Sequence, residues 1–195
     1  ISMKNISVFC GAHLGNNPIY AQEAKKMAEL MAKKGINVVF GGGEVGLMGV
    51  VSNTAMDNGA DAIAISLKSL VDLELVNPRV KEVIVTNTLL DRKDEFMERS
   101  DAFIVLPGGV GSLDELAEIM ASNQLGLINK PVALLNTAGY YDHLIAWMEK
   151  AVGEGFISQA NFNDLIISDS CEDLLEKVIN NKRPSDDDWT NRIGL

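Results

Sequence analysis

The feature that most constrains the fold is the alternation of short apolar runs with longer amphipathic segments along the whole chain. Two runs, AFIVL at 102–106 and VALL at 132–135, are apolar without a break, which is typical of strands covered on both faces. We expect strands at residues 5–10, 37–40, 62–66, 82–86, 102–106, 132–135 and 165–168. The alternation predicts an α/β fold: a doubly wound parallel sheet of about seven strands with helices on both faces.

The segments between these runs carry helix start and stop signals. Residues 18–34 have Pro18 near the start, apolar residues at helical spacing, and Gly35 after two lysines. Residues 112–124, 140–152 and 171–180 follow the same pattern. The 195 residues, 47% of them hydrophobic, suit one domain over the whole chain. Within it, Ile1 and Ser2 are expected to be a cloning remnant and residues 183–195 a polar tail.

Charge and hydropathy exclude several classes of partner. The net charge of −10 opposes general binding to nucleic acid or an anionic membrane. The chain contains no apolar run of the ~18 residues that a membrane span needs and no signal peptide, so we expect a cytoplasmic protein. Cys10 and Cys171 are expected to be buried, reduced thiols. The acidic run at 186–188 indicates a solvated surface more than a metal site.

The first glycine-rich loop, GGGEVGLMG at 41–49, follows the second expected strand. Gly41, Gly43 and Gly46 match the G-x-G-x-x-G dinucleotide fingerprint. That fingerprint also needs an acid at the end of the next strand, but Asp61 precedes its strand, which argues against a nicotinamide or flavin site. We expect Gly42, Gly43 and Gly46 to contact a phosphate. The structural alternative is a tight turn that needs positive φ and close helix packing.

The second glycine-rich loop, PGGVGSLDE at 107–115, follows the fifth expected strand and ends in two carboxylates. Ser112 and Glu115 have the spacing of a capping box, in which each side chain bonds the other's backbone N–H. The positive end of a helix dipole would keep Glu115 ionised. An ionised carboxylate suits the stabilisation of a cation or the activation of water, so capping and catalysis both stay open.

A basic pair follows the fourth expected strand. Thr88 is expected to cap a helix, which places Arg92 and Lys93 in its first turns. Cations there oppose the helix dipole, and a bound phosphate would reverse that effect. Arg92 offers a planar fork for an oxyanion and Lys93 a point charge. Ion pairs with Asp91 or Glu95 are the structural alternative.

Together, GGGEVGLMG, the Arg92-Lys93 pair and PGGVGSLDE resemble the Lonely Guy (LOG) family, whose members are often labelled lysine decarboxylase-like. The likeness extends over CGAHLGNNPIY, KPVALLNTAGYYD and AVGEGFIS, and the family motif is PGGxGTxxE. It implies a Rossmann-like fold and hydrolysis of the N-glycosidic bond of a nucleoside 5′-monophosphate, such as AMP or a cytokinin ribotide. The products are free base and ribose 5-phosphate. It also implies a homodimer that uses no metal and no organic cofactor.

Carried over by position, the resemblance makes Arg92 and Glu115 the catalytic pair. The expected substrate-binding residues are Glu74, Lys93, Gly42, Gly43, Gly46, Gly108, Gly109, Val110, Gly111, Ser112, Leu113 and Asp114. The chain departs from the family where Leu90-Asp91 replaces His-Glu, Ser112 replaces Thr, Val110 and Ser122 replace aromatic residues, and Ala121 takes a polar position. Apart from Ser112, which keeps the hydroxyl, we expect these departures to bear on the choice of base.

Two other functions stay open. A non-catalytic nucleotide or molybdenum-cofactor carrier would share the fold and the glycine loops, although retention of Arg92 and Glu115 favours the enzyme. A dinucleotide-dependent oxidoreductase is disfavoured by the position of Asp61. No lysine follows a strand in the context that pyridoxal phosphate needs, so lysine decarboxylation is not indicated. His13 is more simply read as an incidental loop residue, and the proton donor to the leaving base is unassigned.

Overall fold

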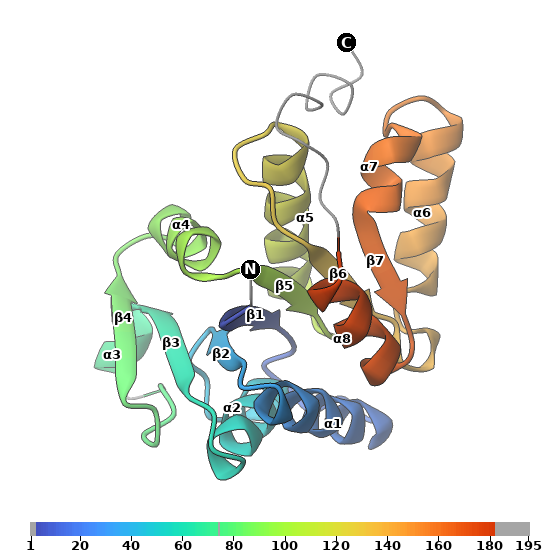
Figure 1. Cartoon of the computed structure of the whole chain (residues 1–195). Coiled ribbons are helices and arrows are strands. Elements are labelled where there is room, and N and C mark those ends of the chain that lie inside the picture. Colours follow the sequence, from blue (N-terminus) through green and yellow to red (C-terminus); the bar gives the residue numbers. More distant parts are fainter. Residues whose placement is uncertain (1–2, 74, 182–195) are drawn as a thin grey trace.

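The computed structural model describes residues 3–73 and 75–181 and contains one seven-stranded sheet (Figure 1). Its order is β4-β3-β2-β1-β5-β6-β7, and all neighbouring strands pair in parallel. The strands are β1 Asn5–Phe9, β2 Asn37–Phe40, β3 Ala62–Leu67, β4 Glu82–Thr86, β5 Ala102–Val105, β6 Val132–Leu135 and β7 Leu165–Ser168. The prediction of a doubly wound parallel α/β sheet is confirmed.

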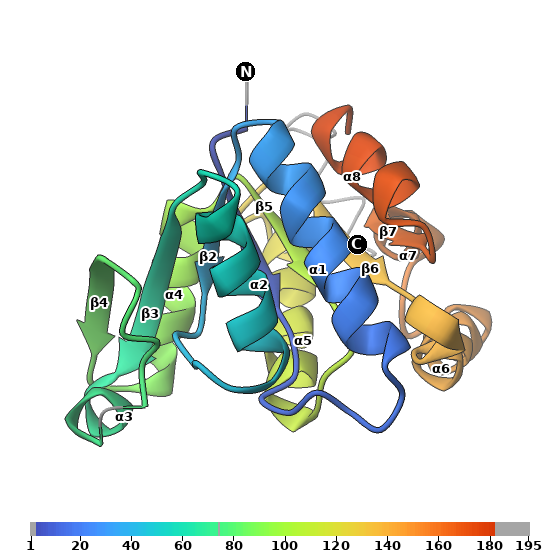
Figure 2. The same ribbon diagram turned by 90° about the horizontal axis from the view of Figure 1, so that it is seen from below.

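Helices cover both faces of the sheet, as the view from below shows (Figure 2). One face carries α1 Ile19–Lys33, α2 Gly46–Asp57 and α8 Cys171–Ile179. The other carries α4 Leu89–Arg99, α5 Val110–Gln124, α6 Asp142–Gly153 and α7 Gln159–Asp164. Two short helices, α3 Lys68–Asp72 and η1 Thr137–Gly139, follow β3 and β6. Two apolar clusters, one on each side of the sheet, form the core.

Side-chain alternation along β5 explains why its sequence is apolar throughout. All four of its residues are buried. Ile104 packs into the cluster under α1, α2 and α8, whereas Phe103 and Val105 pack into the cluster under α4 and α5. Because side chains on both faces of β5 pack into an apolar cluster, neither face meets solvent, and the strand does not alternate between apolar and polar residues.

The order of the strands creates a switch point between β1 and β5. The chain moves outward from β1 to β4 and then returns to place β5 on the other side of β1. The connections that leave β1 and β5 therefore diverge to opposite sides, which opens a crevice at the carboxyl ends of these strands. The glycine-rich loops after β2 and β5 both lie at this edge.

The N-cap predicted from the sequence is found at α4, whereas α5 begins at a different residue from the one predicted. Thr88 caps α4, since its side chain accepts a hydrogen bond of 3.0 Å from the Asp91 N–H. The predicted capping box in α5 is wrong, because the helix begins at Val110 with Gly109 as its N-cap and no side-chain cap bond. Ser112 lies inside the first turn and is buried, with Oγ beside Gly108. Glu115 is consequently a second-turn residue.

Both cysteines are free and buried, as the sequence predicted. Among the described residues, no helix has the length and apolar character needed to cross a bilayer. The acidic run at 186–188 and the expected tail at 183–195 lie outside the described residues, as do Ile1 and Ser2.

Two glycines of the first glycine loop, Gly46 and Gly49, are required by close backbone packing and need no ligand to account for them. Gly46 has φ of +69°, and a Cβ there would lie 2.3 Å from the backbone of Ala12. A Cβ on Gly49 would lie 1.8 Å from the carbonyl oxygen of Glu44. Gly46 thus packs against the loop after β1, and Gly49 packs against the loop after β2, so a side chain at either position would push α2 away from its neighbour.

We predict that Gly49→Ala lowers the free energy of unfolding by about 1–3 kcal/mol, because an added methyl group overpacks this contact. Gly153→Ala is the control, since no atom lies within 4 Å of a Cβ at this helical position. The control is expected to be neutral or up to about 1 kcal/mol more stable. Urea unfolding curves measure both, and an unchanged midpoint for Gly49→Ala would contradict the packing account.

Candidate active site

A cavity of about 720 Å³ lies at the switch point between β1 and β5. Its lining residues lie at the ends of β1 and β3 and on the segments that follow strands β1 to β6, among them Leu70 and Leu75 after β3. Gly41–Val45 and Pro107–Ser112 form two of these walls, and Arg92 and Glu115 face the space between them. The topology thus brings residues from distant parts of the sequence to one edge of the sheet.

Arg92 is a half-buried cation held by backbone oxygens. Its Nε donates to the carbonyl of Ile65 at 2.9 Å and its Nη2 to the carbonyl of Gly41 at 3.2 Å. Its guanidinium lies 5.5 Å from the ring centroid of Phe96. Burial lowers its pKa, and Glu115 opposes that change. A guanidinium has five N–H donors, so an arginine fixed by two carbonyl bonds keeps donors for an anionic ligand.

Glu115 lies half-buried in the same cavity. Burial raises the pKa of its carboxyl group to about 7, and Arg92 is the first of the charges that hold the rise back. The expectation that the helix dipole keeps this group ionised is therefore wrong for the free protein. Desolvation of the carboxylate outweighs the favourable charges around it. A carboxyl group that titrates near neutral pH suits proton transfer.

Lys93 points away from the cavity and joins α4 to α5. Its Nζ lies 3.3 Å from Asp114 and 3.7 Å from Glu118. The sequence alternative of an ion pair within α4 is therefore replaced by a pair between helices. Lys93 and Asp114, both expected to bind substrate, line no part of the cavity. Their contact instead connects the helix that carries Arg92 to the helix that carries Glu115.

The second glycine loop has its carbonyl groups occupied and its N–H groups available. The carbonyl of Pro107 accepts from Gly11, and that of Gly109 accepts from Leu113 within the start of α5. The hydrogen bonds of the described residues provide no acceptor for the N–H groups of Gly109, Val110 and Gly111. These three residues line the cavity at a helix N-terminus, where backbone geometry and dipole both favour an anion.

The first glycine loop is held from two sides. Its Gly41 and Gly42 carbonyls accept from Arg92 and from the Asn77 N–H, and Gly43 pairs with Val76 in an antiparallel bridge. Gly42 has φ of +96°, a conformation that favours glycine. Gly41, Gly42 and Gly43 line the cavity, whereas Gly46 does not, because it packs against Ala12.

Most residues predicted for the site do meet in the cavity. Those that line it are Arg92, Glu115, Gly42, Gly43, Gly108, Gly109, Val110, Gly111 and Ser112. Those that do not are Gly46, Lys93, Leu113 and Asp114. Glu74 lies outside the described residues.

Several lining residues were not predicted. They come from the loop after β1, the first turn of α1, the end of β3 and the turn after β6, and include Cys10, His13, Tyr20, Ser66 and Tyr140. Burial raises the pKa of the Cys10 thiol, so the sulfur stays protonated. The signal that could have found these residues is position, since loops after neighbouring parallel strands share one edge.

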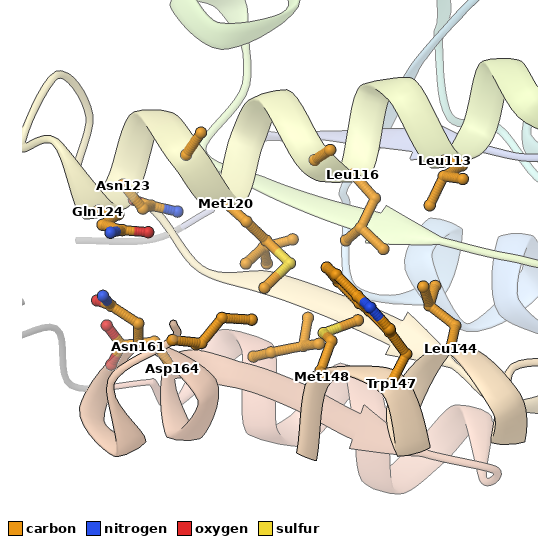
Figure 3. Close-up of a pocket in the computed structure, with 15 residues that line it drawn as sticks. Leu113, Leu116, Met120, Asn123, Gln124, Leu144, Trp147, Met148, Asn161 and Asp164 are labelled. Carbon is orange, nitrogen blue, oxygen red and sulfur yellow. The ribbon is translucent and has the colours of Figure 1, made fainter. Parts of the chain in front are cut away.

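A second, apolar pocket of about 200 Å³ lies between α5 and the pair α6 and α7 (Figure 3). Figure 3 shows Met120 of α5 pointing toward Met148 and Trp147 of α6. Leu113 lines this pocket, on the face of α5 opposite Glu115, and so does not bind at the main cavity. In the described part of the chain, no group of three or more His, Cys, Asp or Glu side chains is arranged to hold a metal ion.

We predict that Arg92→Gln raises the pKa of Glu115 above its native value near 7, because the variant removes the charge that most favours the carboxylate. A ¹³C NMR titration of the Glu115 carboxyl group measures this. Arg99→Gln, near the far end of α4, is the control, since Arg99 pairs with Glu95 and Glu82. A native pKa near 4.5, or no shift in Arg92→Gln, would contradict the electrostatic account.

Known sequences resemble this chain over most of its length. The family described as "Possible lysine decarboxylase" matches residues 48–178. The chain is 38% identical over 190 residues to cytokinin riboside 5′-monophosphate phosphoribohydrolase LOG2 of Arabidopsis thaliana, which covers 97% of this chain and 89% of that protein. It is 40% identical over 174 residues to a probable enzyme of the same name, LOGL1 of Oryza sativa subsp. japonica, with 89% and 78% covered.

Solved structures share the fold. The molybdenum cofactor binding protein of Rippkaea orientalis superposes with a TM-score of 0.67 at 26% identity, over 89% of this chain and 94% of that one. The molybdenum cofactor carrier protein of Chlamydomonas reinhardtii has a TM-score of 0.68 at 17% identity, over 90% and 95%. Identity to the plant phosphoribohydrolases is higher and extends over 89–97% of the chain. This chain therefore belongs to the LOG family, whose family description is "Possible lysine decarboxylase".

Proposed function

We propose that the protein is a nucleoside 5′-monophosphate phosphoribohydrolase that cleaves the N-glycosidic bond of AMP or a cytokinin ribotide. The observation that carries the proposal is the meeting of Arg92 and Glu115 in one cavity, beside three available backbone N–H donors. The names of the plant relatives support the same reaction. The products are free base and ribose 5-phosphate.

In the proposed complex, the 5′-phosphate binds at the N-terminus of α5. The N–H groups of Gly109, Val110 and Gly111 and the hydroxyl of Ser112 supply donors there, opposite the glycine loop that follows β2. The remaining donors of Arg92 bind ribose or phosphate oxygens. Binding energy from the phosphate then fixes the sugar for reaction.

The reaction passes through a ribose that carries positive charge, as in other glycoside hydrolyses. The bond between C1′ and the base nitrogen breaks, its electron pair stays with the base, and the base takes up a proton from solvent to leave as the free base. The Glu115 carboxylate faces the cationic carbon, orients a water molecule and takes its proton as the new C1′–O bond forms. A pKa near 7 lets Glu115 accept that proton and later release it to solvent.

A carrier of a pterin nucleotide is the second candidate, because solved structures of this fold include molybdenum cofactor binding proteins. A carrier needs donors for the phosphate but has no use for a carboxyl group titrating near neutrality beside the bound sugar. Lysine decarboxylation fits poorly, because none of the described residues that line the cavity is a lysine able to hold pyridoxal phosphate.

The resemblance also implies a homodimer, and we include this assembly and a cytoplasmic location in the proposal. Exposed apolar side chains surround the cavity mouth at Val45, Leu75 and Val110, of which Val110 is 83% exposed. A subunit interface would cover such side chains. Sedimentation equilibrium measures the assembly directly, and a monomer at micromolar concentration would overturn it.

Incubation of the purified protein with AMP, isopentenyladenosine monophosphate and a panel of other nucleoside monophosphates tests the reaction. We expect release of free base and ribose 5-phosphate in equal amounts, detected by chromatography. Tight nucleotide binding with no base released from any substrate would favour the carrier. If the protein neither bound any of these nucleotides nor released base from them, the proposed nucleotide site itself would be overturned.

We predict that Glu115→Gln lowers kcat by at least about 100-fold while the Kd for AMP changes little, because the amide cannot accept a proton or match the cationic sugar. Calorimetry with AMP and the base-release assay measure the two quantities. Glu149→Gln, on the exposed face of α6, is the matched control. Turnover of Glu115→Gln within fivefold of the native protein would remove Glu115 from the mechanism.

A further inference from the structure

Two consecutive tyrosines after β6 hold the second glycine loop from the side. The hydroxyl of Tyr140 donates to the carbonyl of Gly108, and the hydroxyl of Tyr141 donates to the carbonyl of Leu106 at 2.7 Å. Both residues lie more than 30 positions from the loop in sequence, so only the pairing of β5 with β6 brings them there.

The turn that presents these tyrosines is strained and firmly held. Ala138 has φ of +52°, the one positive φ at a non-glycine residue in the described part of the chain. The Asn136 side chain accepts from the Tyr141 N–H at 2.8 Å and donates to Asp142 at 2.7 Å. Residues persist in such a conformation only where their surroundings determine it, and they concentrate at functional sites.

Because a peptide unit is planar, the bond from Tyr140 to the Gly108 carbonyl also fixes the direction of the Gly109 N–H. The C=O of Gly108 and the N–H of Gly109 belong to one planar trans peptide and point in opposite directions. Tyr140 binds the carbonyl from the β6 side of the loop. The Gly109 N–H therefore points away from the Tyr140 hydroxyl, and Gly109 lines the cavity.

We infer that Tyr140 is a positioning residue: its hydroxyl fixes the Gly108–Gly109 peptide so that the Gly109 N–H is aimed at the phosphate of the substrate. The inference rests on the proposed function for the identity of that anion. Tyr141 holds the Leu106–Pro107 peptide, and the Asn136 side chain holds the Tyr141 backbone, so both support the position of Tyr140. Without the Tyr140 hydroxyl, this peptide is free to rotate and must be ordered at each binding event.

Replacement of Tyr140 by Phe tests the inference, because the ring and its edge contacts with Tyr20 and Tyr141 are kept while the hydroxyl is lost. We expect the Kd and KM for AMP to rise about tenfold, the effect of one misaligned hydrogen bond to a charged group. The Kd for adenosine, which lacks the phosphate, is expected to stay unchanged, as is kcat within about twofold. If Tyr140→Phe only destabilised the fold, the affinities for AMP and for adenosine would change by the same factor.

Ser170→Ala is the stability control. It removes the N-cap bond to the Asp173 N–H on α8, a hydroxyl-to-backbone contact outside the cavity. We expect it to lower Tm by roughly 2–4 °C without changing the ratio of AMP to adenosine affinity. An equal ratio in Tyr140→Phe and the native protein would overturn the inference.

A second measurement does not depend on hydrolysis. In ¹⁵N-labelled native protein, inorganic phosphate is expected to shift the Gly109 amide resonance, and in Tyr140→Phe to shift it at about tenfold higher concentration. A phosphate response in native protein that releases no base would overturn the proposed hydrolysis and leave the positioning intact. Identical Gly109 responses in the two proteins, or none in the native protein, would overturn the positioning.

Discussion

Burial of a wholly parallel sheet on both of its faces is the constraint on which the rest of this structure depends. Parallel strands need crossover connections, and the two apolar faces need helices to cover them. The chain meets both needs by winding outward from β1 and returning at β5. The carboxyl ends of β1 and β5 then diverge, and their loops enclose a cavity that no single segment of the sequence defines.

The electrostatics of the cavity follow from that enclosure. Loops on both sides exclude enough water to raise the pKa of Glu115 to about 7, while Arg92 limits the rise. The same enclosure lowers the pKa of Arg92. The charge of each group opposes the pKa shift that burial causes in the other. The Lys93–Asp114 ion pair connects the helices that carry them. Burial and charge together set the pKa of a carboxyl group for which the sequence left capping and catalysis both open.

The comparison with molybdenum cofactor binding proteins shows that the fold does not decide the chemistry. These proteins superpose over about nine-tenths of the chain, yet the plant phosphoribohydrolases are the more similar in sequence. A switch-point cavity with glycine-rich walls is a general nucleotide site. The carboxyl group of Glu115 and the guanidinium of Arg92 within this cavity are what distinguish a hydrolase from a carrier.

The sequence by itself determined the strands, the layers and the edge at which the site lies, because periodicity and glycine position are local properties of the chain. It also singled out Arg92 and Glu115, through the motifs that resemble one family. Only the tertiary structure decided that α5 begins at Val110, that Lys93 pairs with Asp114, and that burial outweighs the helix dipole at Glu115. It alone revealed that Tyr140 and Tyr141 hydrogen-bond to the second glycine loop and to Leu106 just before it. Desolvation and contacts between distant strands depend on how the whole chain folds, so no local pattern encodes them.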